Sequence, residues 1–232
     1  MPHRAETKRL ILALDAAGDA CSVALGGVSG ATCEILAAER AEMKHGHAAA
    51  LVPMVERVMM AAGIELGQVG AIACGIGPGG FTGLRIALAT ARGLGLALDR
   101  PVIGISSFQA AAAGLAPAER QGLAGDNLVL IDSRREEPYA ARLGPDLTFR
   151  QPPRFMTLPE IAADIEAAPP ALVTGDAVDL WPAPFPATVK RQPQAADARA
   201  ILRLAADPDG RYAMKPAPLY LRAADVSVPK AL

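Results

Sequence analysis

Residues 75–86 read Gly-Ile-Gly-Pro-Gly-Gly-Phe-Thr-Gly-Leu-Arg-Ile and lead into the apolar stretch 87–98, Ala-Leu-Ala-Thr-Ala-Arg-Gly-Leu-Gly-Leu-Ala-Leu. An apolar run at 69–74 precedes them and predicts a buried strand, and the later stretch predicts a long helix from about Thr82. A glycine loop between strand and helix turns backbone N–H groups toward an anion, although glycine also lets a helix pack closely on a sheet. No Gly-Lys-Ser/Thr follows, which excludes a Walker loop. A phosphate-binding loop and a packing loop both remain open.

The composition argues against direct binding of nucleic acid. The chain has 232 residues, is 51% hydrophobic and carries a formal net charge of −1, with only 4% aromatic residues. Such a chain can bury a substantial core. Proteins that grip nucleic acid alone usually present a basic surface, which this composition does not predict. We therefore expect any contact with RNA to be indirect.

The cysteines and the first residues bear on the cellular compartment in which the protein is expected. Cys21, Cys33 and Cys74 lie in apolar stretches without Cys-x-x-Cys spacing, as expected for reduced thiols. Residues 1–9 carry charges of both signs, and the apolar run after them is too short for a signal sequence. We expect no run long enough to span a membrane. These features predict a soluble, cytoplasmic protein.

The first half of the chain predicts three strands joined by tight turns, followed by alternating helices and strands. Glycines at 18 and at 26–27 mark the expected turns. The expected bounds are strands 10–15, 20–25 and 31–36, helix 47–62, strand 69–74, helix 82–98 and strand 102–105.

The second half predicts a repeat of the same unit. Its expected bounds are strands 128–132, 139–143 and 147–150, helix 159–167, strand 171–175 and helix 197–206. Residues 168–194 are rich in proline, and we expect them to be dominated by loops. A duplicated βββαβα unit predicts an α/β protein with the actin-like ATPase (ribonuclease-H-like) fold. We expect an N-terminal lobe over 1–104 and a C-terminal lobe over 105–232, with the last residues returning to the first lobe.

Three motifs resemble the bacterial TsaB (YeaZ) family. Residues 77–90 resemble the family's Gly-Pro-Gly-Ser-Phe-Thr-Gly-Leu-Arg-Ile-Gly-Leu-Ala-Thr run, with Gly80 for the serine and Ala87 for a glycine. Residues 132–139, Asp-Ser-Arg-Arg-Glu-Glu-Pro-Tyr, are similar to a family turn, and 218–222 carry its Pro-x-Tyr-Leu-Arg ending. The resemblance extends over nearly the whole chain.

The resemblance implies a subunit rather than an enzyme. Its members support the TsaD synthase, which forms N6-threonylcarbamoyladenosine at position 37 of ANN-decoding tRNAs. The implied partners are a TsaD-type synthase, a TsaE-type ATPase and, when the protein is alone, a second copy as a homodimer. It implies that tRNA is contacted only indirectly, and we expect no membrane partner. The alternative function is an actin-like ATPase or phosphotransferase with nucleotide between the lobes.

Asp15 ends the first predicted strand, where actin-like ATPases keep a carboxylate that holds metal-bound phosphates through water. This chain reads Asp15-Ala16-Ala17, so the hydroxyls that usually follow are missing. The alternative interpretation assigns Asp15 no function and has it start the turn to Gly18. We expect no cofactor and at most weak ATP binding. The candidate nucleotide or phosphate loop consists of Asp15, Gly77, Gly79, Gly80 and Thr82.

Arg85 and Thr82 belong to the start of the predicted helix. A cation there opposes the helix dipole by about 0.3–1 kcal/mol, so Arg85 requires a compensating partner. We expect a carboxylate, from Asp15, Asp132 or Glu56, and as a second possibility a bound anion. Thr82 is the expected N-cap.

We expect no catalytic residues and no metal site. His45 and His47 are two residues apart, a spacing that places side chains on different faces of a helix. The related TsaD synthase carries a His-x-x-x-His metal pair at the equivalent helix, and this chain has Met43 and Leu51 at the flanking positions. The serines show no Gly-x-Ser-x-Gly motif.

The two long predicted helices form a candidate interaction surface. The helix over 82–98 is apolar on almost every side, so one sheet cannot cover it. Small residues permit close approach and methionines suit adaptable contacts, although packing between the two helices explains part of this pattern. In the family that the chain resembles, these helices form a four-helix bundle with another subunit. The residues expected to bind the partner are Leu51, Met54, Val58, Thr82, Leu84, Ile86, Ala87, Ala89, Thr90 and Ala91.

Overall fold

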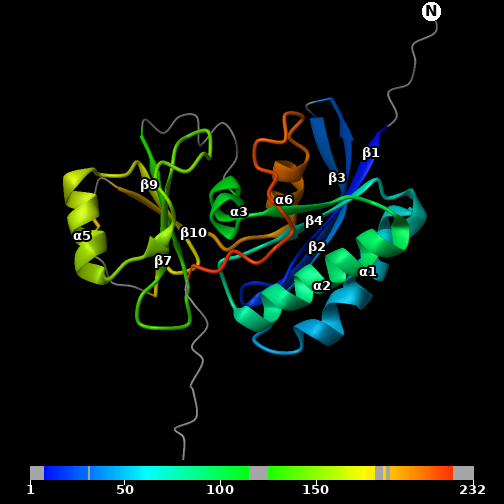
Figure 1. Cartoon of the computed structure of the whole chain (residues 1–232), viewed down its shortest axis with the longest axis horizontal. Helices are drawn as coiled ribbons and strands as arrows, with labels where there is room; N and C mark the ends of the chain where they lie inside the picture. The colour runs from blue at the N-terminus through cyan, green and yellow to red at the C-terminus, as the bar shows by residue number, and fades with distance from the viewer. Residues whose placement is uncertain (1–7, 31, 115–124, 181–184, 187–188, 222–232) are drawn as a thin grey trace, which may run out of the picture.

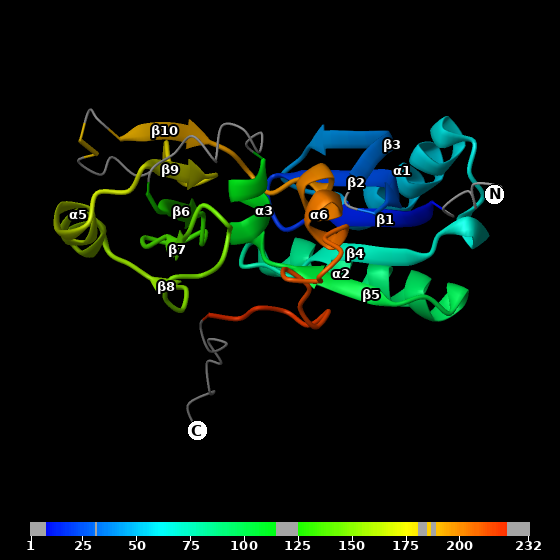
Figure 2. The same ribbon diagram turned by 90° about the horizontal axis from the view of Figure 1, so that it is seen from above.

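The computed structural model describes residues 8–30, 32–114, 125–180, 185–186 and 189–221. Two five-stranded sheets lie beside each other, and the helices α3 (Ser107–Ala113) and α6 (Ala198–Ala205) occupy the space between them (Figures 1 and 2). The chain is thus a mixed α/β protein with two lobes.

The first sheet has the strand order β3-β2-β1-β4-β5. Its strands are β1 (Arg9–Asp15), β2 (Ala20–Ser29), β3 (Thr32–Glu42), β4 (Ala71–Gly75) and β5 (Val102–Ile105). The first three are antiparallel, and β4 and β5 run parallel to β1. A short 3-10 turn, η1 (Leu66–Gln68), precedes β4. Parallel neighbours require crossover helices, which are α1 (His47–Ala62) and α2 (Phe81–Leu98).

Both faces of this sheet are buried, which its apolar strands require. Along β1, Leu12 and Leu14 pack toward α1 and α2, whereas Ile11 and Ala13 pack toward α3 and α6. This alternation follows from the two-residue period of a strand.

The second sheet repeats the first. Its strands are β6 (Asn127–Ile131), β7 (Tyr139–Leu143), β8 (Arg154–Phe155), β9 (Leu172–Gly175) and β10 (Lys190–Pro193), in the order β10-β9-β6-β7-β8. Within each lobe the order is therefore third-second-first-fourth-fifth. The helix α5 (Leu158–Ala167) begins with a capping box between Thr157 and Glu160. The duplicated topology confirms the predicted actin-like, ribonuclease-H-like fold.

The helix α6 ties the two halves of the chain together. It follows the second sheet in sequence, yet Ile201 and Leu202 pack in one cluster with β1 of the first sheet. At its start, the Ala198 N–H donates to Ser22 Oγ at 3.0 Å. The division into 1–104 and 105–232 stays a prediction.

The predicted turn at residues 26–27 is wrong, because β2 continues through both glycines to Ser29. A Cβ on Gly26 would lie 2.6 Å from Leu202 Cδ2 and 2.8 Å from the Glu34 carbonyl oxygen. Glycine is therefore needed for close packing against α6 and β3, and the chain turns later, at Gly30.

The predicted strand at residues 147–150 is also wrong. Leu147 has a φ of 62°, and the Asp146 carboxylate accepts a bond from the Thr148 hydroxyl at 2.8 Å. These local bonds favour a turn over a strand. The third strand of this sheet is β8, and β10 forms within the segment expected to be dominated by loops.

Within the described residues, α2 is long and apolar enough to span a membrane by length and composition alone. The expectation that no run reaches this length is therefore wrong. However, α2 is the crossover between the parallel strands β4 and β5, and it packs on their sheet. Its buried residues are Gly83, Leu84, Ala87, Leu88, Ala91 and Gly95. It is a helix of the folded core and not a membrane span.

Candidate functional site

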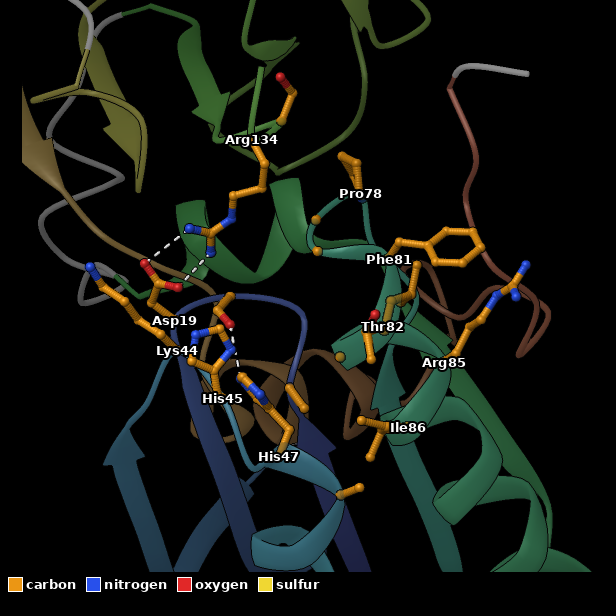
Figure 3. Close-up of a pocket in the computed structure, with 18 of the residues that line it drawn as sticks. Asp19, Lys44, His45, His47, Pro78, Phe81, Thr82, Arg85, Ile86 and Arg134 are labelled. Carbon is orange, nitrogen blue, oxygen red and sulfur yellow. Dashed lines mark hydrogen bonds and ion pairs between the residues drawn. The ribbon is translucent and has the colours of Figure 1, made fainter. Parts of the chain in front are cut away.

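A cleft of about 1080 Å³ lies between the lobes, at the end of the first sheet where α1 and α2 begin (Figure 3). One wall comes from the glycine loop and the start of α2, and another from Lys44, His45 and His47 before and at the start of α1. The second lobe contributes Ser133, Arg134, Arg135 and Tyr139. The floor includes Ala16, Gly18 and Asp19 of the β1–β2 turn, and Leu219 and Tyr220 complete the lining.

The glycine loop packs directly against the β1–β2 turn. The Gly80 N–H donates to the Ala17 carbonyl oxygen at 2.7 Å. A Cβ on Gly79 would lie 2.6 Å from the same oxygen, and one on Gly83 would lie 1.8 Å from the Ala16 carbonyl oxygen. Close packing thus requires glycine at positions 79 and 83. The contact also occupies the Gly80 N–H, which a bound phosphate would need as a donor.

The helix α2 begins at Phe81 with Gly80 as its N-cap. The prediction that Thr82 is the N-cap is therefore wrong. Gly80 has a φ of −59° and a ψ of 120°, and the cap makes no side-chain hydrogen bond. Because the β1–β2 turn presses against residues 79–83, the chain enters the helix earlier than the sequence suggests.

Asp15 lies beneath the cleft and is not part of its lining. Its side chain is buried, with 2% exposed, and its Oδ1 has no hydrogen-bond partner within the described residues. Burial raises the pKa of Asp15 to about 7, opposed by a hydrogen bond from the backbone of Ala17. The carboxyl group packs against Gly75, where a Cβ would lie 2.1 Å from Oδ1.

Two aromatic rings compensate the positive charge of Arg85 at the start of α2. Its guanidinium carbon lies 3.7 Å from the centroid of the Phe81 ring, and its Nε donates to the Tyr220 hydroxyl at 3.1 Å. The rings of Phe81 and Tyr220 stack with centroids 6.0 Å apart. Within the described residues Arg85 has no ion pair, so the expected partnership with Asp15, Asp132 or Glu56 is wrong. A guanidinium over a ring face gains a cation–π interaction instead.

The C-terminal segment brings Tyr220 to the cleft. It runs along the first lobe, where Met214 bridges Gly104 and the Leu219 N–H donates to the Ile76 carbonyl oxygen at 2.8 Å. Arg92 of α2 donates to the Pro216 carbonyl oxygen. Our sequence reasoning missed Leu219 and Tyr220 as lining residues, although the Pro-Leu-Tyr-Leu-Arg ending was a visible signal.

An ion pair joins the two lobes across the cleft. Both terminal nitrogens of Arg134, in the β6–β7 turn, contact the Asp19 carboxylate, at 2.7 and 3.1 Å. This contact holds the pKa of Asp19 below its usual range. The turn itself is shaped by Asp132, which accepts from the Arg134 N–H at 2.8 Å. The sequence offered no sign of the Asp19–Arg134 pair.

The two histidines do not converge. His47 opens α1 and its Nε2 lies 3.3 Å from the Gly18 carbonyl oxygen, whereas His45 lies on the exposed segment before it. The described residues contain no cluster of three or more side chains suited to a metal ion.

The residues predicted to bind a partner fall into two groups. Six are buried inside this chain: Leu51, Met54, Val58, Leu84, Ala87 and Ala91. Thr82, Ile86, Ala89 and Thr90 remain wholly or partly accessible on α2. The sequence could not separate the groups, because both faces of α2 carry small and apolar residues. Exposed Val52, Met60 and Leu96 were not among the predicted residues.

Comparisons with known proteins place this geometry in a family. A family model described as "TsaD: tRNA N6-adenosine threonylcarbamoyltransferase" matches residues 34–148. The Escherichia coli K12 protein described as "tRNA threonylcarbamoyladenosine biosynthesis protein TsaB" is 39% identical over 133 residues, which cover 56% of this chain and 53% of that protein. This chain thus matches about half the length of such curated relatives.

Two further matches extend over more of the chain. An uncharacterized Mycobacterium tuberculosis protein is 32% identical over 182 residues, 77% of this chain and 76% of that protein. The solved structure of YeaZ from Pseudomonas aeruginosa is 29% identical, has a TM-score of 0.73, and is matched over its full length by 92% of this chain. From the duplicated lobes, the glycine loop and these matches together, we conclude that the chain belongs to the TsaB (YeaZ) family.

Proposed function

We propose that this chain is a non-catalytic subunit in the formation of N6-threonylcarbamoyladenosine on tRNA, and that it acts by binding a TsaD-type synthase. The names of its relatives support the pathway. The observation that carries the proposal is an exposed apolar surface on α1 and α2, which we call the α1–α2 face.

The α1–α2 face consists of one stripe on each helix. On α1 it includes Val52 and Met60, whose side chains are 49% and 75% exposed, and on α2 it includes Leu96, which is 86% exposed. Ala89 and Gly93 are also exposed on α2, at the spacing of one helix face. The exposed Glu56 lies among them on α1, one turn from both Val52 and Met60. Large apolar side chains exposed together on one face of a protein mark a candidate interaction site. Small residues between the larger ones allow a helix of the partner to approach closely.

The same face fits the other partners implied by the family. A second copy of the chain occupies it when the synthase is absent, which gives a homodimer. A TsaE-type ATPase joins the complex through the synthase, tRNA is contacted only indirectly, and the complex works in the cytoplasm. Because the matching family model is named for a transferase, a catalytic role of this chain is also to be tested.

Three features support a non-catalytic role. Leu51 is buried in the helix that carries the metal histidines of the related synthase. Asp15 is buried below the cleft, and the Gly80 N–H is bonded to Ala17. We expect no threonylcarbamoyl transfer by the purified chain. Turnover of the threonylcarbamoyl-adenylate and tRNA without synthase would contradict this role.

The binding experiment is a pull-down with the TsaD-type synthase of the same organism. Ala89→Glu puts a charge into a dry interface and should abolish binding, because an unpaired buried charge costs several kcal/mol, about 3–5. Ala163→Glu is the matched control, since Ala163 is exposed on α5 of the other lobe. If Ala89→Glu and Ala163→Glu bind the synthase equally well, the α1–α2 face is not the binding surface.

The second candidate function is an actin-like ATPase or phosphotransferase. The size of the cleft between the lobes favours it, because a cleft of about 1080 Å³ has room for a nucleotide. The closed contact between residues 16–17 and 79–83 disfavours it. We expect weak or no binding in a calorimetric titration with Mg-ATP. Tight binding that Asp15→Ala abolishes would support the ATPase instead.

A further inference from the structure

We propose that the cleft between the lobes receives an acidic peptide segment of the protein that binds the α1–α2 face. This inference rests on the proposed function and names the chemistry of a second contact with the same partner. It assigns the cleft to a stretch of Asp and Glu side chains rather than to a nucleotide.

The charge of the cleft is the first argument. Its lining contains four basic side chains, Lys44, Arg85, Arg134 and Arg135, and one carboxylate, Asp19. The whole chain has a formal net charge of −1, so this excess of positive charge is a local feature. Arg134 is paired with Asp19 and with Asp132, and the lining as a whole still holds more cations than carboxylates. A concave surface with an excess of one sign attracts the opposite charge. The exposed Glu136 follows on the same turn but does not belong to the lining.

The cations come from separate elements and are spread along the cleft. Lys44 precedes α1, Arg134 and Arg135 belong to the β6–β7 turn of the second lobe, and Arg85 belongs to α2. Figure 3 shows Lys44 and Arg85 on opposite sides, with Arg134 directed at Asp19 between them. Arg134 also contacts Asp132 and Asp19 at 3.3 and 2.7 Å, so the lobes and the cleft share one charge network. Charges spread along a cleft suit several carboxylates in a row better than one compact phosphate.

The apolar part of the lining favours a peptide as well. Phe81 and Tyr220 are both about half exposed, and Ile86 and Leu219 lie beside them in the cleft lining. Rings with an exposed face can cover apolar side chains that alternate with carboxylates. The place where a phosphate would meet the glycine loop is occupied instead by the backbone contact between Gly80 and Ala17.

The cleft is continuous with the α1–α2 face. Thr82 and Ile86 line the cleft and stand on the accessible side of α2, and Ala48 does the same at the start of α1. A partner bound along these helices therefore reaches the cleft without crossing other surface. Complementary charge at the rim of such an interface mainly changes the association rate and the salt dependence.

The test compares charge reversals in the cleft with reversals elsewhere. The variant Lys44→Glu/Arg135→Glu should weaken binding of the full-length synthase about tenfold at low salt and flatten the dependence of Kd on salt. The control Arg154→Glu/Lys190→Glu reverses two exposed cations of β8 and β10 and should change Kd less than about twofold. Circular dichroism confirms that each variant folds, and Lys44→Gln/Arg135→Gln replaces any that does not.

Cross-linking identifies the occupant. A benzophenone amino acid placed at His45 in the complex should capture a synthase peptide rich in Asp and Glu, read by mass spectrometry. Capture of a peptide without acidic residues, or of RNA, overturns the inference. So does Mg-ATP binding that the double charge reversal abolishes, because it assigns the cleft to a nucleotide.

Different results would contradict the two proposals. If Ala89→Glu loses binding while the double variant keeps its Kd and salt dependence, the α1–α2 face is the binding surface and the cleft holds no acidic segment. Binding that survives in both variants removes the proposed function as well.

Discussion

The two lobes share one strand order but cover their sheets differently. In the first lobe the outer surface of α1 and α2 exposes Val52, Met60 and Leu96. In the second lobe, α5 buries Ile161 and Ile165 and turns Glu160 and Glu166 toward solvent. Polar exteriors are what a surface helix ordinarily has. The large exposed apolar side chains of α1 and α2 are therefore not required by the fold. Among the described residues α5 exposes none, although Leu180 elsewhere in the second lobe is 59% exposed.

The ends of the first strand in each lobe differ as well. Asp15, at the end of β1, is buried with an unpartnered oxygen, whereas Asp132, after β6, accepts from the Arg134 N–H and donates through its own N–H to Asp176 at 2.8 Å. The equivalent positions of the two lobes thus carry one carboxyl group with an unpartnered oxygen and one whose polar groups are hydrogen-bonded.

The largest expected effect separates the two faces of α2. Ala87 is fully buried against the first sheet, so Ala87→Glu should lower the free energy of unfolding by about 4 kcal/mol or more, since it buries an unpaired charge. Ala89→Glu, two residues later on the exposed face, should change it by less than about 0.5 kcal/mol. Urea denaturation measures both. Equal destabilisation by the two variants would mean that α2 has no exposed face.

The next effect depends on pH and concerns Asp15. Its pKa is about 7 in the folded protein against 3.8 as the reference value, so ionisation is disfavoured by folding. The stability that protonated Asp15 gives is complete below pH 4 and is lost as the pH rises through 7. Asp15→Asn removes this loss and should be more stable than the parent by about 4 kcal/mol at pH 8, and this difference in stability should shrink as the pH falls toward 4.

Urea denaturation at several pH values between 4 and 8 measures this effect of Asp15→Asn. Asp132→Asn is the comparison in the second lobe, because the Asp132 carboxylate is hydrogen-bonded. A stability difference for Asp15→Asn that stays constant over this range would show that Asp15 does not ionise in it.

A smaller effect distinguishes packing glycines from solvent-facing ones within α2. Gly83→Ala should destabilise the protein by about 2 kcal/mol, because the new Cβ would lie 1.8 Å from the Ala16 carbonyl oxygen. Gly93→Ala meets no atom within 4 Å and should stabilise the helix by about 0.5–1 kcal/mol. Thermal unfolding compares the two. Stabilisation by Gly83→Ala would contradict the close contact at the glycine loop.

The smallest effect concerns the ion pair between the lobes. Both side chains are nearly half exposed, so Asp19→Asn should cost less than about 1 kcal/mol at pH 7. The lowered pKa of Asp19 means that its contribution is present above pH 4 and is lost as the pH falls below it. The sign is opposite to that for Asp15. A double-mutant cycle with Arg134→Ala measures the coupling, and coupling above about 2 kcal/mol would show an unusually strong link between the lobes.

Much of the architecture was predictable from the sequence. Helix α1 has the predicted bounds, and α2 begins within one residue of the predicted start. The strands β5 and β7 also have the predicted bounds. These segments have strong hydrophobic periodicity, and each has a glycine or proline next to at least one of its ends, which are local signals. The short strands β8 and β10 lack such signals and depend on pairing with neighbouring strands.

The candidate site was predictable only in part. The sequence identified the glycine loop and the two helices, because their unusual composition lies in one stretch of chain. It could not identify the contacts of Arg85 with Tyr220 or of Arg134 with Asp19, whose members lie 135 and 115 residues apart. It also could not tell the buried Ala87 from the exposed Ala89.

By itself, the sequence determined the order of the elements in the first lobe, the duplication and the family, since these follow from local patterns along the chain. The tertiary structure alone decided which side of α2 faces solvent, which side chains meet in the cleft, and that Asp15 is sealed below it. The reason is physical. Burial and ion pairing depend on how distant segments pack against one another, and the same residue types serve either outcome.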